Sequence, residues 1–284
     1  MKKSKKNRIA ICICAVTFTT FLNAIKVSAD TNDGIYHISS DLQNVTFETI
    51  EDSNGMSIMV DPNVKVTNVN FLCGAHINGG ISINSLYSSS FISDAGTLNG
   101  NTFINALVTF HDDTKGSDNT FKDTEIAQAY NTSLENTVLI NSSLHAQRNT
   151  SMMGETFVTS NSQLGLSGVT LENLTVDSTS SVFASFSGES DINISKIVND
   201  GYFNIYVSRP DLRSHIINIG DYSGSGIIHM YINLADNQAA DLTINQTAAG
   251  VKNLVNIKND GSKDANENSR VNLIKVNSKD LFFR

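Results

Sequence analysis

A short motif recurs through the middle of the chain at nearly constant spacing. In each copy an apolar residue follows a polar pair such as Asn-Thr or Glu-Thr, and successive copies lie 18, 17, 19 and 17 residues apart. The five apolar positions are Phe103, Phe121, Val138, Phe157 and Leu174. Self-similarity at a fixed short period indicates a repeat architecture, because one unit cannot bury its apolar face without neighbouring units stacked on it.

A second apolar position follows the first by five to seven residues in most copies, at Val108, Ile126, Leu144 and Leu164. A unit of this length holds two or three short strands and the bends between them. Elsewhere, short alternating runs bounded by Asn, Asp, Gly or Ser dominate, and helical periodicity is almost absent. The sequence therefore predicts an all-β chain folded as a parallel β-helix, a solenoid.

The first 29 residues have the pattern of a secretory signal peptide. A basic start, MKKSKKNR, precedes an apolar stretch over Ile9–Leu22, and the small residues of Val27–Ala29 precede a cut at Asp30. The apolar stretch is too short and too rich in Thr for a membrane span. A retained N-terminal anchor is the alternative interpretation.

Removal of residues 1–29 makes the chain strongly acidic. It leaves 14 Lys and Arg against 28 Asp and Glu, so the formal net charge goes from −8 to −14. Such a balance disfavours nucleic acid and anionic membranes as partners. The single remaining cysteine, Cys73, lies in the apolar run VNFLCGA, which favours an inert buried thiol over a nucleophile.

Acidic residues gather in the run HDDTKGSDNTFKDTE, at Asp112, Asp113, Asp118, Asp123 and Glu125. Parallel β-helices also occur in glycosidases and polysaccharide lyases, and glycoside hydrolysis needs two carboxylates that face one cleft. At this repeat length, Asp113 and either Asp123 or Glu125 are expected on adjacent bends. A solvated acidic loop is the favoured interpretation.

No other pattern indicates catalysis or metal binding. The run at 258–269 places Asp260, Asp264 and Glu267 in a polar turn without EF-hand spacing, which favours a hairpin loop over a calcium site. The histidines show no metal-binding spacing, and a G-x-S-x-G nucleophile motif is absent. They are His37, His76, His111, His145, His215 and His229. We therefore predict a protein that is not an enzyme, with no catalytic, cofactor-binding or metal-ligating residue and no cofactor.

The repeats resemble a known family. The runs NTFKDTEIAQ, TVLINSS and TFVTSNSQ are similar to the short repeats of autotransporter passenger domains of the diffuse-adherence adhesin type. Those repeats follow N-T-x-V-x-x-G-G-x-Q, and the paired Gly is replaced here by Thr124-Glu125, Ser142-Ser143 and Asn161-Ser162. The array is therefore a degenerate form of the family pattern, and we expect bends at Ser142-Ser143 and Asn161-Ser162.

A second resemblance covers residues 218–279, which look like the pertactin-type C-terminal segment of autotransporter passengers. The matching parts are a glycine-rich entry over Gly220–Gly226, a strand ending at Asn233-Leu234, the strand Asp241–Ile244, a small-residue turn over 247–250, and two closing strands within 251–257 and 271–276. In that family the segment caps the β-helix and assists its folding during secretion. The resemblance implies the same autochaperone-like role here. Together with the repeats, it predicts an all-β, right-handed parallel β-helix with a β-rich C-terminal cap.

The expected organisation is a signal peptide at 1–29, an N-terminal β-rich part at 30–98, degenerate repeats at 99–200 and a pertactin-like capping segment at 201–284. Autotransporters continue into an outer-membrane β-barrel, whereas this sequence ends at Arg284 with no room for one. We therefore expect either a truncated gene product or a stand-alone passenger. It would be exported to the cell surface or secreted, and periplasmic if no barrel is supplied.

The two resemblances together imply a surface adhesin or self-association protein with a role in virulence. Its partners would be the host cell surface or glycans, other copies on neighbouring cells, and the outer-membrane translocation machinery. A secreted β-helix lyase or glycosidase that uses the acidic cluster is the alternative from a different functional class.

Overall fold

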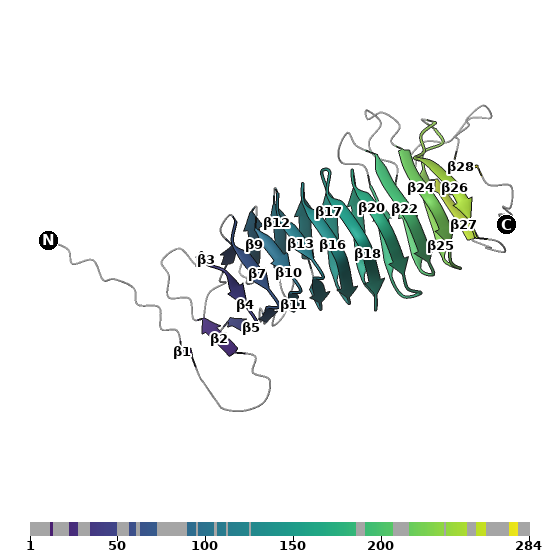
Figure 1. Ribbon diagram of the computed structural model, residues 1–284. Helices are drawn as coiled ribbons and strands as arrows, with labels where there is room; N and C mark the ends of the chain where they lie inside the picture. The colour runs from purple at the N-terminus through teal and green to yellow at the C-terminus, as the bar shows by residue number, and fades with distance from the viewer. Residues whose placement is uncertain are drawn as a thin grey trace.

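The computed structural model describes most of the chain beyond residue 34 and two short stretches before it. The described ranges are 12–13, 23–27, 35–49, 57–60, 63–72, 90–94, 96–104, 107–111, 113–124, 126–185, 191–206, 216–235, 237–248, 254–259 and 273–277. Every regular element within these ranges is a β-strand. The strands follow one another in chain order along one long axis, from the purple N-terminal end to the yellow C-terminal end (Figure 1).

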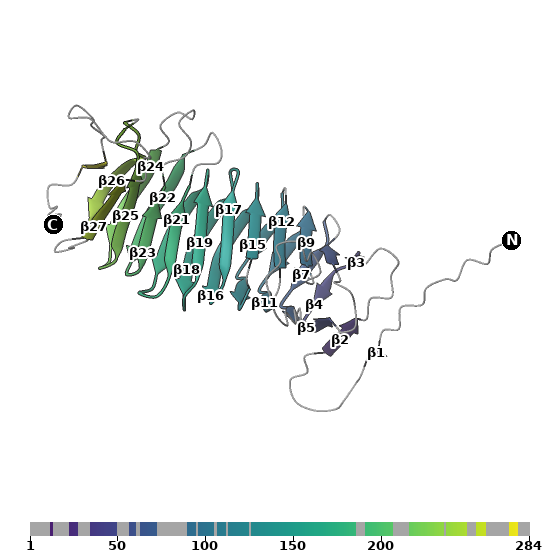
Figure 2. The same ribbon diagram turned by 180° about the vertical axis from the view of Figure 1, so that it is seen from behind.

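Eleven strands form sheet B, in which each strand pairs in parallel with the sheet-B strand of the turn before it. The strands are β3 (Ile35–Ile38), β6 (Ser57–Val60), β9 (Ser90–Asp94), β12 (Leu107–His111), β15 (Ile126–Tyr130), β17 (Ser143–Gln147), β19 (Gln163–Ser167), β21 (Ser181–Ala184), β23 (Tyr202–Ile205), β25 (Ile227–Ile232) and β27 (Leu254–Asn259). Figure 2 shows them side by side.

Sheet A holds the other 17 strands. Early turns contribute two short strands each, namely β4 (Leu42–Gln43), β5 (Val45–Thr49), β7 (Lys65–Thr67), β8 (Asn70–Leu72), β10 (Thr97–Asn99), β11 (Thr102–Ile104), β13 (Lys115–Ser117) and β14 (Thr120–Lys122). Later turns contribute one strand each, namely β16 (Ser133–Ile140), β18 (Ser151–Thr159), β20 (Thr170–Val176), β22 (Ile192–Asn199), β24 (Ile216–Ser223), β26 (Asp241–Thr247) and β28 (Ile274–Val276). The change occurs at β16, which pairs with both β13 and β14.

Parallel strands that alternate between two sheets, turn after turn, define a parallel β-solenoid, so the predicted all-β β-helix is confirmed. Its right-handedness stays a prediction. The ladders run without a break past the predicted boundaries, since β10 pairs with both β7 and β13, and β22 pairs with both β20 and β24. The described strands of the predicted C-terminal cap therefore continue the same two sheets.

The segments predicted at the N-terminus lie mostly outside the described residues, as does Cys73. Within residues 1–29 the structure describes β1 (Cys12–Ile13) and β2 (Asn23–Val27), and β2 pairs in parallel with β5. Cleavage at the predicted site would remove this strand from sheet A. Nowhere in the described ranges is there a helix long and apolar enough to cross a membrane.

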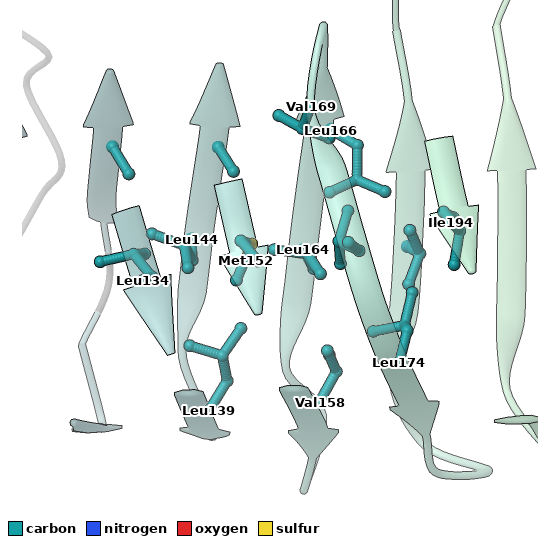
Figure 3. Packing of buried hydrophobic residues seen from close by; sticks show 14 of the residues in the cluster. Leu134, Leu139, Leu144, Met152, Val158, Leu164, Leu166, Val169, Leu174 and Ile194 are labelled. Carbon is teal, nitrogen blue, oxygen red and sulfur yellow. The ribbon is translucent and has the colours of Figure 1, made fainter. Parts of the chain in front are cut away.

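The core lies between the two sheets and repeats from turn to turn. Leu134 and Met152 on sheet A project toward Leu144 and Leu164 on sheet B, and all four are 2% exposed or less (Figure 3). Along the axis the register pairs Leu134 with Met152 and Leu144 with Leu164, so each side chain also packs on its counterpart in the next turn. Complete burial of one such side chain stabilises the fold by roughly 1.5–3 kcal/mol.

The predicted repeat alignment is wrong by one residue in the middle of the array. Phe121 pairs with Leu139 and not with Val138, and Leu139 pairs with Val158 and not with Phe157. Because side chains alternate between the two faces of a strand, this shift reverses their direction. Leu139 and Val158 are completely buried, whereas Phe157 is 37% exposed.

Two other predicted positions also lie outside the columns to which the sequence assigns them. Leu174 is buried but pairs with Thr156, so it belongs to a different inward column from Phe121. On sheet B, Ile126 pairs with Leu107, while the column that begins at Val108 continues through Ala127. The column is then completed by Leu144 and Leu164, as predicted. The spacing of the repeat is therefore confirmed, but Val138, Phe157 and Ile126 are one residue out of register and Leu174 is two residues out.

The register allows a deletion that tests the fold. Thr137 pairs with Thr156, so removal of residues 137–155 joins Asn136 to Thr156 and excises one turn. We expect this variant to stay folded with a modestly lower melting temperature, because a solenoid loses only one set of neighbour contacts. Removal of residues 145–163 joins Leu144 to Leu164, its partner in the unbroken register between β17 and β19, so one extra residue is left, which reverses inward and outward side chains and should unfold the adjacent turns. Circular dichroism melting distinguishes the two, and equal loss of structure in both variants would contradict a solenoid.

Candidate functional site

The bends between strands are built from residues in left-handed backbone conformation. Fourteen non-glycine residues within the described ranges have positive φ, and most of them are Asn or Asp. These two residue types tolerate that conformation best, because their short polar side chains can hydrogen-bond locally. The Asn-rich composition that the sequence shows is therefore explained in large part by the bends.

The predicted acidic cluster is distributed over three bends of one turn. Asp113 precedes β13, Asp118 separates β13 from β14, and Asp123 follows β14, with φ values of 62°, 54° and 50°. Consecutive members are five positions apart along nearly extended chain, about 16 Å at 3.3 Å per residue. Glycosidase carboxylates lie roughly 5–9.5 Å apart. Asp112 and Glu125 lie outside the described residues.

Two of these carboxylates also take part in hydrogen bonds along the solenoid axis. Asn136 Nδ2 donates to Asp118 Oδ1 at 2.9 Å, and Asn141 Nδ2 donates to Asp123 Oδ1 at 2.8 Å. In both cases the donor occupies the equivalent bend of the next turn, 18 residues later. The acidic residues of this run therefore serve to connect successive bends.

A second set of polar residues stacks inside the solenoid. The backbone N–H of Thr124 donates to Ser142 Oγ at 3.0 Å, that of Ser142 to Ser162 Oγ at 3.1 Å, and that of Ser162 to Ser180 Oγ at 3.1 Å. All four residues are buried. A bend at Asn161-Ser162 is confirmed, whereas the bend expected at Ser142-Ser143 lies one residue earlier, at Asn141-Ser142, because Ser143 begins β17. The replacement of paired Gly by Ser provides a hydroxyl ladder at this corner.

An internal amide ladder supports the neighbouring corner. Asn101 is completely buried, and its Oδ1 accepts the backbone N–H of Val69 while its Nδ2 donates to the carbonyl of Val66. Asn119 repeats the arrangement one turn later, accepting from Asn101 N and donating to the carbonyl of Leu98. Buried polar groups paired in this way stabilise a bend without a cost for unsatisfied hydrogen bonds.

Asp177 holds two consecutive left-handed residues of the preceding turn, Ser160 and Asn161. Its carboxylate accepts hydrogen bonds from the N–H of Ser160 at 2.7 Å and from both the N–H and the hydroxyl of Thr179. Thr179 Oγ1 in turn accepts a hydrogen bond from the N–H of Asn161. Burial raises the pKa of Asp177, but hydrogen bonds from Ser180, Ser160 and Thr179 outweigh burial and lower its pKa below the usual value.

This lowered pKa predicts a loss of stability in acid. A carboxyl group with a depressed folded-state pKa stabilises the native state above its unfolded pKa of about 3.9, and that contribution disappears as the pH falls through the folded pKa. We expect Asp177→Asn to lower the melting temperature at pH 7, and the difference from wild type to shrink below about pH 4. Melting curves between pH 7 and pH 2 measure this difference. A gap that stays constant over the whole range would contradict the assignment.

A group of aromatic and cationic side chains covers the outward face of sheet B near its C-terminal end. We call it the aromatic platform, and its members are Phe183, Tyr202, Tyr206, His229, Tyr231 and Lys258. They come from β21, β23, β25 and β27 and the residue after β23, which are consecutive along the sheet (Figure 2). The intervening residues of these strands, such as Phe203 and Ile228, point into the core and are completely buried.

The rings of the platform are arranged against one another. Tyr206 and Tyr231 stack with centroids 4.4 Å apart and an interplanar angle of 14°, and Phe183 stacks on Tyr206 at 6.2 Å. Lys258 Nζ lies 5.3 Å from the Tyr231 ring centroid, in cation–π contact. Tyr202 lies beside His229 with centroids 5.9 Å apart.

The sequence reasoning missed the aromatic platform. The signal was present in the runs YFNIYV and GIIHMYINL, where rings occur on both faces of one strand. Alternation of polar and apolar residues is what distinguishes the outward face from the inward one. Tyr202 beside Phe203 gives no such contrast, so the sequence alone does not show that the Tyr202 ring points outward.

The other residues considered from the sequence for metal binding form no such group within the described ranges. Of the histidines, His145 and His229 project from the outward face of sheet B on strands that are not adjacent, and His76 and His215 lie outside the described residues. Asp260, Asp264 and Glu267 also lie outside them. Across the described ranges no three His, Cys, Asp or Glu side chains form a group that could hold a metal ion.

Comparison with known proteins gives one family match. Residues 202–284 match the family model described as Pertactin. This segment is pertactin-like. The matched region begins at Tyr202, the first residue of β23, and includes all described strands from β23 to β28. The sequence-based resemblance of the C-terminal segment to pertactin-type passengers is therefore confirmed.

A solved structure and the curated sequences complete the comparison. The crystal structure of a hyper-glycosylated TibA55-350 fragment, with TibC as the catalyst of glycosylation, is 12% identical in sequence. It has a TM-score of 0.45 over 91% of this chain and 97% of that chain. No curated protein matches the sequence.

Proposed function

We propose that this chain is an exported autotransporter-passenger-like protein that acts as a surface adhesin or in self-association between cells, without enzymatic activity. The observation that carries the proposal is the pertactin-like segment at the end of an unbroken solenoid. Solenoids present long flat faces made of equivalent positions on successive turns, which suits binding to extended partners.

The distribution of polar groups supports a binding function more than catalysis. The bend carboxylates Asp118 and Asp123 accept hydrogen bonds from neighbouring turns, and Asp113 lies on a third bend. The glycosidase or lyase alternative requires two of them to face one substrate. The outward faces of the sheets are therefore the better candidates for function, and host cell surfaces, glycans or other copies of the chain are the proposed partners.

The test is attachment of cells that export the protein. A non-adherent bacterial strain that expresses the full chain together with a translocation partner is compared with the same strain carrying an empty vector. Protease treatment of intact cells first establishes that the protein is at the surface. We expect increased attachment to epithelial cells or increased settling by aggregation. Surface-exposed protein that changes neither would contradict the proposal.

A matched pair of variants tests the enzymatic alternative. Asp113→Asn and Asp123→Asn, alone and together, should leave attachment unchanged, because neither residue belongs to an outward sheet face. Loss of cleavage of any polysaccharide in these variants, relative to wild type, would instead establish the carbohydrate-active enzyme.

A further inference from the structure

We propose that the aromatic platform binds a glycan chain that carries carboxylate groups. The inference rests on the proposed adhesive function and identifies both the surface and the class of partner. It depends on three properties of the platform: how its side chains are aligned, how rigidly they are held, and which charges surround them.

The register of sheet B aligns the platform in neighbouring outward columns. Tyr202 pairs with Ile227, which pairs with Leu254, and in the next column Asn204 pairs with His229, which pairs with Asn256. Tyr231 pairs with Lys258 in the third column. Strands in a sheet are about 4.8 Å apart, so successive turns present one contact after another along the solenoid axis. An extended polymer of sugar rings can follow such a row, with each ring meeting a new strand.

The platform combines apolar ring surface with hydrogen-bonding groups. The C–H faces of sugar rings pack against aromatic side chains, while sugar hydroxyls need polar partners beside those rings. Tyr202 is the most accessible ring of the described platform, at 42% exposed, and Ile227, Leu254 and His229 border it. Tyrosine hydroxyls, the His229 imidazole and the Asn256 amide supply donors and acceptors on the same face.

Stacking holds the platform rings in place before a ligand arrives. Tyr231 lies between the Tyr206 ring at 4.4 Å and the Lys258 ammonium at 5.3 Å, so its side chain is contacted from both directions along the axis. Rings that are already ordered lose little conformational entropy on binding, which is the general advantage of a preorganised surface.

The four strands of the platform carry no acidic residue, unlike the chain as a whole. The protein has a formal net charge of −8, yet β21, β23, β25 and β27 contain no Asp or Glu, and their one charged residue is Lys258. An acidic protein repels anionic partners over most of its surface, so strands that carry a cation and no carboxylate offer a place where an anionic partner can approach. Carboxylate groups on the sugar rings satisfy this requirement.

A second copy of the chain fits the same surface less well. Two copies related by a two-fold axis would place platform against platform. That arrangement would bury two Lys258 cations in one interface, with no acidic side chain on the described strands of either face to pair with them. We therefore assign the platform to an acidic glycan, and contact between copies is an outcome that the experiment distinguishes.

The experiment is affinity electrophoresis of the purified full chain through gels that contain polygalacturonate, uncharged dextran or dextran sulfate. Tyr202→Ala removes the exposed ring and Lys258→Gln removes the cation. The control is Tyr130→Ala. Tyr130 lies on β15, outside the platform, and its ring is also in cation–π contact, with Arg148 Cζ 5.6 Å from the ring centroid. Melting temperatures establish that each variant folds, and Lys258→Gln, on the exposed part of β27, remains informative if Tyr202→Ala does not fold.

We expect polygalacturonate to retard the wild-type protein more strongly than dextran does. Tyr202→Ala and Lys258→Gln should each weaken binding about tenfold, which corresponds to about 1.4 kcal/mol, while Tyr130→Ala should bind as wild type does. Three results would overturn the assignment. The first is that polygalacturonate fails to retard the wild-type protein, and the second is that Tyr130→Ala weakens polygalacturonate binding as much as the platform variants do. The third is that dextran sulfate binds more strongly than polygalacturonate and Tyr202→Ala leaves that binding unchanged.

Two further measurements separate this inference from the proposed function. Sedimentation at several concentrations detects self-association, and a dimer that is lost in Tyr202→Ala would overturn the glycan assignment in favour of contact between copies. If the wild-type protein does not bind polygalacturonate, and cells that export wild type or Tyr202→Ala attach equally well, the glycan assignment of the platform is refuted and the adhesive function stands. Polygalacturonate binding without any attachment would support the platform and refute adhesion.

Discussion

Replacement of Phe121 by Ala should destabilise the protein by about 3–5 kcal/mol, the usual cost of truncating a buried aromatic residue. Phe121 is completely buried and stacks on Phe103 with centroids 5.3 Å apart and an interplanar angle of 18°. Phe110 lies against the same two rings, at 5.9 Å from Phe121 and 5.8 Å from Phe103. A cavity at this position therefore removes contacts in two turns and both sheets. Urea denaturation followed by circular dichroism measures the change.

Phe157→Ala is the matched control, because the sequence repeat assigns Phe157 to the same position as Phe121. Phe157 points outward from β18 and is 37% exposed. Its truncation should cost less than about 1 kcal/mol, as is usual for surface substitutions. If the two variants lost equal stability, the observed register would be wrong and the alignment from the sequence would be correct.

The period could be predicted from the sequence, whereas the exact register could not. A repeat of about 18 residues holds two or three short strands and their bends, and units of that size must stack to bury their apolar faces, so the fold class follows from the repeat. In the run Val138-Leu139-Ile140, however, three apolar residues stand in succession. Alternation is the only local sign of which residue points inward, and such a run contains none. The structure selects Leu139, because only this choice continues the column of Phe121.

The sequence left a catalytic site at the acidic cluster open as an alternative, because it could not place the carboxylates relative to one another. Asp113, Asp118 and Asp123 are close in sequence, and spacing alone does not distinguish a shared cleft from separate corners. The tolerance of Asp and Asn for left-handed backbone supplies the missing physical reason for their positions. Equivalent bends elsewhere are occupied by Asn44, Asn68 and other residues that carry no charge. The residue type is therefore selected by the bend, and its charge is incidental to that role.

Replacement of Gly224 by Ala should be among the most damaging substitutions in the C-terminal segment, with a loss of about 3 kcal/mol or more. Gly224 has a φ of 105°, which side chains rarely permit, and a Cβ there would lie 2.2 Å from the carbonyl oxygen of Asn199 in the preceding turn. The neighbouring residues fix this close approach, since Gly226 N donates to Asn199 O at 2.7 Å and Ser225 N donates to Asp200 Oδ1 at 2.9 Å.

The buried side chains beside this bend leave it little freedom to move. Asn199 is completely buried, and its Nδ2 donates to Tyr222 Oη at 2.9 Å. Burial raises the pKa of Tyr222 to about 12, so its hydroxyl stays protonated in the physiological range. The backbone of Gly224 therefore cannot retreat from Asn199 without disturbing a buried hydrogen bond, and the clash must be relieved by opening the turn itself.

Because each turn of a solenoid contacts only its neighbours, the damage from Gly224→Ala should be concentrated in the turns that contain β24–β26. Hydrogen exchange should show lost protection in these strands while the amides of β16 and β18 stay protected. Gly165→Ala is the control, because its added Cβ would meet the exposed imidazole of His145, a flexible side chain that can move aside. Uniform loss of protection along the whole chain would show that the turns unfold as a single cooperative unit. That result would contradict the prediction that the damage stays within the turns of β24–β26.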